Sequence, residues 1–354
     1  MAYQYYLGAT SPGGFAGFFD TLASGEKLKL YIIKSGPGSG KSSLMKRLAA
    51  RLESRGLSRE LIRCSSDPDS LDGLICRERG FAIIDGTAPH VVEPSIPAAR
   101  ERVLSLYDTI DSAALSQKLT RLESLFSQNA ALHARAKSFI AAAGSLARDL
   151  MRAATGCFYE DKARRYARSL AAKLLPPLGG EGGAERLRVL SAATPKGLYG
   201  FAAENASLCE RAYVFDDRFG ALAALLLSEI RDAALRAGYG FTACRSFLNP
   251  YESIDALFFE EQSLCFINGA LLDTELPHAK RIRDARFYSV ESLAGKAKRL
   301  SFEKKAARSL LEEAARLLAE AKAVHDEIES HYSAAVDFEL LREREEKLYI
   351  ELGV

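Results

Sequence analysis

The stretch YIIKSGPGSGKSSLM, residues 31–45, sets a glycine-rich turn between two apolar patterns of different period. The apolar run from Leu28 to Ile33 predicts a buried strand before the turn. After it, leucines recur every four residues, which predicts one face of an amphipathic helix. These leucines are Leu44, Leu48 and Leu52. The order strand, glycine-rich turn, helix decides the fold class that we expect, an α/β protein.

The turn matches the phosphate-binding pattern G-x-x-x-x-G-K-[ST] at its end, where Gly40, Lys41 and Ser42 stand. Ser35 replaces the leading glycine, and we expect this serine to tighten the entry of the loop without removing an amide donor. Glycines allow successive N–H groups to turn toward phosphate oxygens at the positive end of a helix. The residues expected to contact a nucleotide are Gly36, Pro37, Gly38, Ser39, Gly40, Lys41, Ser42 and Ser43. We expect Lys41 to reach the outer phosphates of ATP and the Ser42 hydroxyl to ligate Mg²⁺.

Length and composition favour a globular chain with more than one core. The 354 residues are 48% apolar, and the formal net charge of +2 gives no overall field that would attract nucleic acid or membrane. The six cysteines form no C-x-x-C pair, so neither a zinc site nor a disulfide framework is expected. The N-terminus lacks a signal-peptide pattern and the apolar run 219–227 is too short to cross a bilayer. We expect a soluble, cytoplasmic protein that does not bind membranes.

An internal repeat relates the two parts of the chain. LGATSPGGFAGF at 7–18 returns as LSAATPKGLYGF at 190–201. Three further pairs of segments follow in the same order: 31–45 with 213–227, 66–74 with 248–257, and 81–90 with 264–278. The offset of 182 to 184 residues is sustained until an insertion before His278, and this order predicts a duplication.

The second copy lacks the phosphate and metal chemistry of the first. Its counterparts of Gly40, Lys41, Ser42, Asp67 and Asp85 are Leu222, Ala223, Ala224, Asn249 and Asn268. The residues retained in both copies are Pro68 (Pro250), Asp72 (Asp255), Gly86 (Gly269), Pro89 (Pro277) and His90 (His278). What persists in a copy that cannot hold phosphate is expected to be structural.

Asp85 ends the apolar run Phe81 to Ile84, where an acid that holds Mg²⁺ beside a phosphate loop is expected. The next residue is Gly86, whereas many fast ATPases have a glutamate there to orient water. Rapid unassisted hydrolysis is therefore not predicted.

The segment CSSDPDSLDG, 64–73, follows a strand expected at 61–64, and its acids would lie at the ligand-binding edge of a parallel sheet. Asp67 is expected to assist the metal or orient an acceptor. For Asp69, a role in a turn or as a helix cap is as well supported as a role in the site. For Asp72, the turn or capping role is favoured. His90 could transfer protons, but its echo at His278 favours a structural role.

The sequence resembles a little-characterised bacterial group of tandem P-loop proteins labelled ATPase or nucleotide-kinase-like. The resemblance rests on GATSPGGF (8–15), GPGSGKSSLMK (36–46), CSSDPDSLDG (64–73) and DGTAPHVVEP (85–94), and it spans nearly the whole chain. It implies ATP binding and names no substrate. Members usually keep a P-loop in both halves, so the degenerate second loop departs from the family pattern.

The expected architecture is two duplicated P-loop NTPase-like halves, each with three layers, a mainly parallel sheet and a long helical arm. Apolar residues at helical spacing predict that the arms form helical hairpins or coiled coils. The expected parts are an active half at 1–110, an arm at 111–174, a Gly/Pro linker at 175–186, a degenerate half at 187–290 and an arm at 291–354.

The leading hypothesis is a magnesium-dependent ATPase or nucleotide-kinase-like phosphotransferase, an enzyme with one live site, whose acceptor would be a small molecule. Neither an N-K-x-D guanine signature nor an L-S-G-G-Q transporter signature occurs, which favours ATP. The alternative is an ATP-gated module whose arms bind a protein partner. Nucleic-acid binding is the less favoured reading of ten basic residues between 278 and 309, for which a solvated helix face is the simpler explanation. These are Lys280, Arg281, Arg283, Arg286, Lys296, Lys298, Arg299, Lys304, Lys305 and Arg308.

Overall fold

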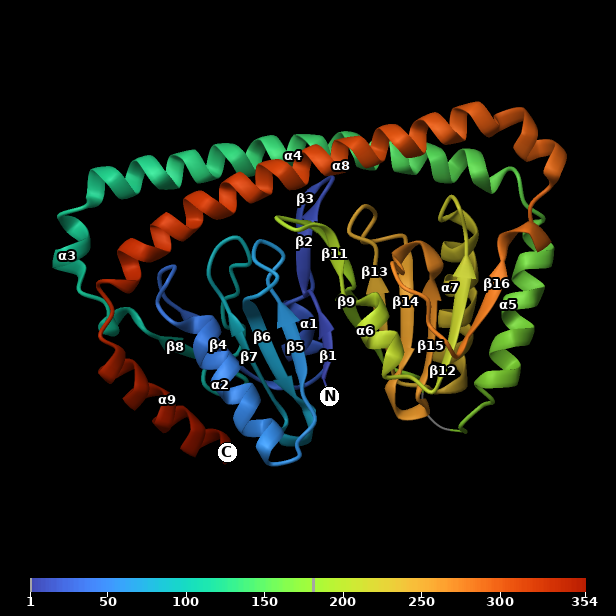
Figure 1. The fold of residues 1–354 in the computed structure, drawn as a ribbon. Helices are drawn as coiled ribbons and strands as arrows, with labels where there is room; N and C mark the ends of the chain where they lie inside the picture. Colours follow the sequence, from blue (N-terminus) through green and yellow to red (C-terminus); the bar gives the residue numbers. More distant parts are fainter. Residues whose placement is uncertain (1, 180–181) are drawn as a thin grey trace.

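The computed structural model describes residues 2–179 and 182–354 as an α/β protein with two six-stranded sheets (Figure 1). The first sheet has the order β1 (Tyr3–Tyr5), β5 (Glu60–Arg63), β6 (Leu71–Cys76), β7 (Phe81–Asp85), β4 (Lys29–Lys34) and β8 (Glu101–Ser105). The second has the order β9 (Glu185–Val189), β13 (Phe241–Arg245), β14 (Ile254–Phe259), β15 (Leu264–Asn268), β12 (Arg211–Asp216) and β16 (Ala279–Arg283). In each sheet one strand, β6 or β14, is antiparallel to the rest. The mainly parallel character is therefore confirmed, and both sheets have the same strand order in chain sequence.

Short hairpins and helices complete each half. The hairpins are β2 (Gly8–Ser11) with β3 (Gly14–Gly17), and β10 (Ser191–Thr194) with β11 (Gly197–Gly200). The α-helices are α1 (Asp20–Ser24), α2 (Lys41–Ser54), α3 (Ser112–Ser116), α4 (Leu119–Thr155), α5 (Glu160–Leu174), α6 (Ala202–Ser207), α7 (Ala221–Ala237), α8 (Val290–Ser333) and α9 (Phe338–Leu352). Short 3₁₀ helices are η1 (Arg77–Arg79), η2 (Tyr107–Thr109), η3 (Glu260–Gln262), η4 (Gly269–Leu271) and η5 (Asp284–Arg286).

The alternation of side chains along the strands divides the interior into three cores. In β4, Ile32 faces a central core that also contains α1 and α6, while Ile33 faces α2 and α9. In β12, Val214 faces the same central core, while Phe215 faces α5 and α7. The two sheets thus share the central core, and the halves are layered around it as one body.

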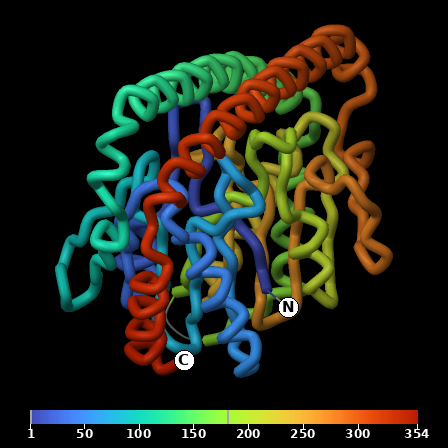
Figure 2. Tube along the Cα trace, turned by 60° about the vertical axis from the view of Figure 1, so that its left-hand side comes forward, coloured from blue at the N-terminus to red at the C-terminus, as the bar shows by residue number. Residues whose placement is uncertain are grey.

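The helical arms are exchanged between the halves. Helix α4 leaves the first half and α8 leaves the second, and the two lie side by side across the top of the molecule (Figures 1 and 2). Helix α5 then packs on α7, where Arg168 Nε lies 2.7 Å from a Glu229 carboxylate oxygen. Helix α9 packs on α2, where Arg47 Nε donates to Glu345 at 2.9 Å. Of the two expected arrangements, helical hairpins or coiled coils, a hairpin of the long helix within its own half is not found, because α4 pairs with α8 of the other half.

The boundary between the halves also differs from the expected linker at 175–186. Strand β9 begins at Glu185, so Arg186 belongs to the second sheet, and residues 180 and 181 lie outside the described residues. Edge strands of the two sheets meet where Tyr6 and Val189 exchange backbone hydrogen bonds of 2.9 and 2.8 Å. This direct contact fixes how the two sheets lie against each other.

Candidate functional site

Residues 35–40, the glycine loop, connect β4 to α2. Gly38 and Gly40 have φ angles of +61° and +87°, a conformation that favours glycine. Ser35 is not among the residues with positive φ, so the serine there is not held in the conformation that favours glycine. Its side chain is buried, and its Oγ has no hydrogen-bond partner in the described part of the chain.

Lys41 and Asp85 come together because β4 and β7 are adjacent parallel strands, with Ile33 opposite Asp85. Lys41 Nζ lies 3.5 Å from Asp85 Oδ2 and donates to the Gly36 carbonyl at 2.6 Å. Both side chains are nearly buried, at 11% and 13% exposure. The backbone N–H and the hydroxyl of Thr87 donate to Asp85 Oδ1 at 2.9 and 2.6 Å, which orients the carboxylate.

Gly86 lies too close to β4 to carry a side chain. A Cβ there would lie 2.2 Å from Ile32 Cγ2, and a Cβ on Gly269 would lie 3.0 Å from Val214 Cγ1 at the corresponding place. A side chain at position 86 therefore requires the Ile32 side chain of β4 to shift. The structural explanation for glycine in both copies agrees with these contacts.

Ser42 begins the buried side of α2 beside the start of β6. Its Oγ accepts a hydrogen bond of 3.0 Å from the Leu71 N–H, so the hydroxyl is held near the carboxyl-end edge of the sheet. Ser43, the last residue expected to contact nucleotide, is exposed. Ser42 and Asp85 each offer oxygen atoms, the type of ligand that Mg²⁺ prefers.

Asp72 is a site residue that sequence reasoning missed. It was expected in a solvated turn or helix cap, but it lies in β6 at 8% exposure, and its burial raises the pKa of its carboxyl. One ligand atom each from Asp72, Asp85 and His90 lie within 4.8 Å of one another. The short apolar run Leu74 to Cys76 after it was the signal for a strand, and β6 begins at Leu71.

His90 differs from its counterpart in the second half. It is 9% exposed, its Nε2 lies 3.8 Å from Asp72 Oδ1, and its ring stacks on Phe19 with centroids 4.9 Å apart. His278 is exposed. The two histidines therefore do not share an environment, and the echo no longer supports a purely structural role for His90. The Nδ1 atom of His90 is buried and has no hydrogen-bond partner among the described residues. In metal sites the ring nitrogen that does not bind the metal usually donates a hydrogen bond, and His90 lacks this bond to any described residue.

Asp67 lies outside this group of three and organises a turn. Its carboxylate accepts hydrogen bonds from Ser70 Oγ at 2.7 Å and from the Asp69 N–H at 3.3 Å. The same carboxylate lies 3.6 Å from Lys322 Nζ of α8. Asp69 is exposed and pairs with Lys196 of the second half at 2.8 Å. Asp67 thus links the glycine-loop side of the sheet to the arm of the other half.

In the second half, a buried carboxylate accepts hydrogen bonds from backbone N–H groups of the corresponding loop and of the first turn of α7. Asp217 stands at the position of Ser35 and is 5% exposed; it accepts hydrogen bonds from the N–H groups of Ala223 at 2.8 Å and Phe219 at 3.0 Å. The Tyr288 hydroxyl lies 3.2 Å from the same carboxylate, and burial raises the pKa of Asp217. An internal carboxylate therefore lies against the amides of this loop. Sequence reasoning missed this residue, although its acid in place of Ser35 was a visible signal.

When the buried residues of α7 and α2 are aligned, α7 begins two residues earlier than α2. The buried residues Leu44, Leu48 and Leu52 of α2 correspond at a constant offset of 182 to Leu226, Ile230 and Ala234 of α7. At that offset α2 begins at Lys41, whereas α7 begins at Ala221 instead of Ala223. The second loop is shortened because its last two residues are helical.

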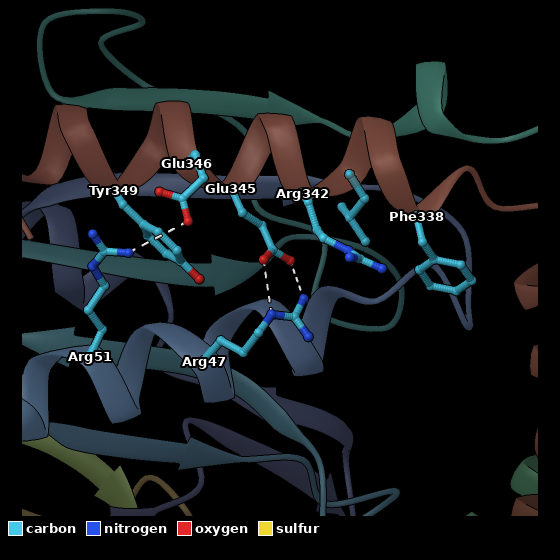
Figure 3. Close-up of a pocket in the computed structure, with 8 residues that line it drawn as sticks. Arg47, Arg51, Phe338, Arg342, Glu345, Glu346 and Tyr349 are labelled. Carbon is cyan, nitrogen blue, oxygen red and sulfur yellow. Dashed lines mark hydrogen bonds and ion pairs between the residues drawn. The ribbon is translucent and has the colours of Figure 1, made fainter.

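A groove of about 670 Å³ lies between α2 and α9 (Figure 3). It is lined by Arg47, Arg51, Phe338, Leu341, Arg342, Glu345, Glu346 and Tyr349. Arg47 pairs with Glu345, while Arg51 lies 3.6 Å from Glu346 and 4.8 Å from the centre of the Tyr349 ring. No lining residue belongs to the glycine loop, and Arg47 and Arg51 are already paired. We therefore interpret the groove as the interface between α2 of the first half and α9 of the other arm.

Five of the ten basic residues between 278 and 309 donate hydrogen bonds to local acceptors. Those that donate to carboxylates or carbonyls are Arg281, Lys296, Arg299, Lys304 and Arg308. This pairing reduces the free positive charge that nucleic-acid binding would use.

Comparison of the chain with protein-family models, curated proteins and solved structures gives no match. Within residues 2–179 and 182–354, no helix has both the length and the apolar character needed to cross a membrane.

Proposed function

We propose that the chain is a magnesium-dependent ATP-binding protein of the P-loop class, an ATPase or phosphotransferase with one live site in its first half. The observation that carries the proposal is the position of Lys41. It opens α2 directly after left-handed Gly40, and its ammonium lies 3.5 Å from the Asp85 carboxylate of the neighbouring strand. A lysine and an acid at the amino end of a helix are the groups that a nucleoside triphosphate with Mg²⁺ requires.

In this proposal Lys41 exchanges its hydrogen bond with the Gly36 carbonyl for the outer phosphates of ATP. Ser42 and Asp85 would hold Mg²⁺, which would neutralise the charge that develops on the phosphates during transfer. Thr87 keeps the Asp85 carboxylate oriented through two hydrogen bonds. The buried pair of Asp72 and His90 lies beside these groups, at the edge where an acceptor would bind.

The second half is proposed to be a duplicated copy that no longer binds nucleotide. The common strand order, the reciprocal arms and the shared glycine contact at Gly86 and Gly269 support the duplication. The Asp217 carboxylate, which already accepts from two loop amides, supports the loss of binding. This half also provides the arm that lies over the live loop.

Hydrolysis of ATP alone is proposed to be slow, because Gly86 offers no side chain to orient water. An acceptor or a protein partner on the arms would accelerate turnover. The alternative function, an ATP-gated interaction module, is supported by the contact of α8 with the glycine loop. Turnover measured with and without acceptors separates the enzyme from the module.

The test is a calorimetric titration with ATP and Mg²⁺ of the parent, Lys41→Ala and Lys46→Ala, an exposed lysine on the same helix. The parent and Lys46→Ala should bind one nucleotide per chain, and Lys41→Ala should bind at least tenfold more weakly, since charged hydrogen bonds contribute about 1.5–3 kcal/mol. Two comparable sites would overturn the one-site assignment. Equal binding by Lys41→Ala would overturn the site itself.

A further inference from the structure

The end of α8 and the start of α9 lie directly on the glycine loop. A Cβ on Gly36 would lie 2.6 Å from the ring of Tyr332, and one on Gly38 would lie 2.5 Å from the Glu329 carbonyl oxygen. A Cβ on Gly40 would lie 2.8 Å from Leu341. Each glycine of the loop therefore faces the arm of the other half, and the loop needs glycines for this contact as well as for its backbone conformation.

The turn after α8 is tied to the first half by its backbone. The Asp111 N–H donates to the Ala335 carbonyl at 2.8 Å, and the Asp337 N–H donates to the Thr109 carbonyl at 2.7 Å. Lys322, about two turns before Glu329, adds its 3.6 Å contact with Asp67. Helix α8 is thus held on both sides of Glu329.

Glu329 brings a negative charge to the loop. Its side chain is 42% exposed, and Nε2 of His325 lies 3.5 Å from its carboxylate. The pKa of Glu329 is lowered, first by the hydrogen bond with His325 and further by the Gly38 N–H and the charge of Lys322. The backbone of Glu329 lies against Gly38, so its carboxylate is a negative charge beside the loop amides, where a phosphate would bind.

We propose that the last turns of α8 cap the glycine loop, and that the Glu329 carboxylate is a built-in competitor for the phosphate position. This inference rests on the proposed function. Nucleotide binding must withdraw Glu329 from Gly38. Because only molecules with an open cap can bind, the apparent affinity for nucleotide is reduced in proportion to the fraction of open molecules. Because α8 is continuous from Val290 to Ser333, a shift of its end reaches the second half. The arms would then report the nucleotide state.

The test compares Glu329→Gln, which keeps the size of the side chain and removes its charge, with Glu327→Gln. Glu327 lies on the same helix and pairs with Arg121 away from the loop. By calorimetry, Glu329→Gln should bind ATP with Mg²⁺ about tenfold more tightly than the parent, and Glu327→Gln should bind like the parent. Equal or weaker binding by Glu329→Gln would refute the cap while leaving the ATP site intact.

Amide hydrogen exchange without nucleotide separates this inference from the proposed function. The amides of residues 38–41 should exchange several-fold faster in Glu329→Gln than in Glu327→Gln, because the cap opens more often. If neither the parent nor Glu329→Gln binds ATP, the proposed function fails, and faster exchange would still support the cap. Unchanged exchange at these amides would refute it whatever the ligand.

Discussion

Replacing Arg188 by methionine should strongly destabilise the contact between the two halves. Arg188, on β9 of the second half, is fully buried; it pairs with Glu60 of β5 and lies 2.8 Å from Glu26 Oε1. Arg77 approaches both acids at 2.7 Å. Methionine fills a similar volume but leaves two buried carboxylates with one guanidinium.

The pKa of Glu60 gives the magnitude. Burial by itself would raise this pKa, but Arg188 and Arg77 outweigh it and lower the pKa from 4.5 to about 2. A difference of roughly 2.5 units at 1.36 kcal/mol each corresponds to about 3 kcal/mol. Since the folded pKa is depressed, this contribution is present above about pH 4.5 and is lost as the pH falls toward 2. Loss of one partner of a buried pair costs about 3–5 kcal/mol, which agrees with this value.

Urea unfolding of the parent and Arg188→Met at pH 7 should show a loss of about 3–5 kcal/mol in the free energy of unfolding. The loss should shrink between pH 4.5 and 3. Arg308→Met is the control, because its partner Glu312 is exposed and such pairs contribute about 0–1 kcal/mol. Adding Glu60→Gln to Arg188→Met should recover part of the loss, since it removes an unpaired charge. A loss no larger than that of the control, or a strictly additive double variant, would refute the reasoning.

Three other predictions concern two buried acids and Asp85, the proposed ligand of Mg²⁺. Burial raises the pKa of Asp255 to about 7, so the folded state binds this proton more tightly and the free energy of unfolding should fall as the pH rises from about 4 to 7. Asp255→Asn should remove that fall and raise the free energy of unfolding at pH 8 by about 4 kcal/mol, measured by urea titration against the parent. Asp217→Ala leaves the amides of Phe219 and Ala223 unpaired and should cost about 2–4 kcal/mol, seen in thermal melts, without creating a second nucleotide site by calorimetry. Asp85→Asn should lower ATP turnover about 100-fold or more with an unchanged melting temperature, and turnover equal to the parent would remove Asp85 from the site.

The local elements and their order could be predicted from the residue pattern. The apolar run before Gly36 gave β4 within one residue of its observed bounds, and the leucines after it gave the buried face of α2, because strand and helix periods are local properties of the chain. Asp85 was placed at the end of a strand for the same reason, and β7 ends there. The repeat predicted two similar halves, and the two sheets do have the same strand order.

Which distant groups meet depends on the packing of the elements, and the residue pattern does not show it. The pairing of β4 with β7 brings Lys41 to Asp85, and the start of β6 brings Asp72 to the same edge. Apolar spacing predicted the arms as helices, but it could not show that the last turns of α8 lie against Gly38. The apolar face of a helix shows that the helix packs against another surface, and it does not show which half provides that surface. From the sequence, Glu329 would be predicted to be one of many charged residues on the solvent-exposed face of a helix. Its place against a loop almost 300 residues earlier follows from packing, which sequence spacing does not encode.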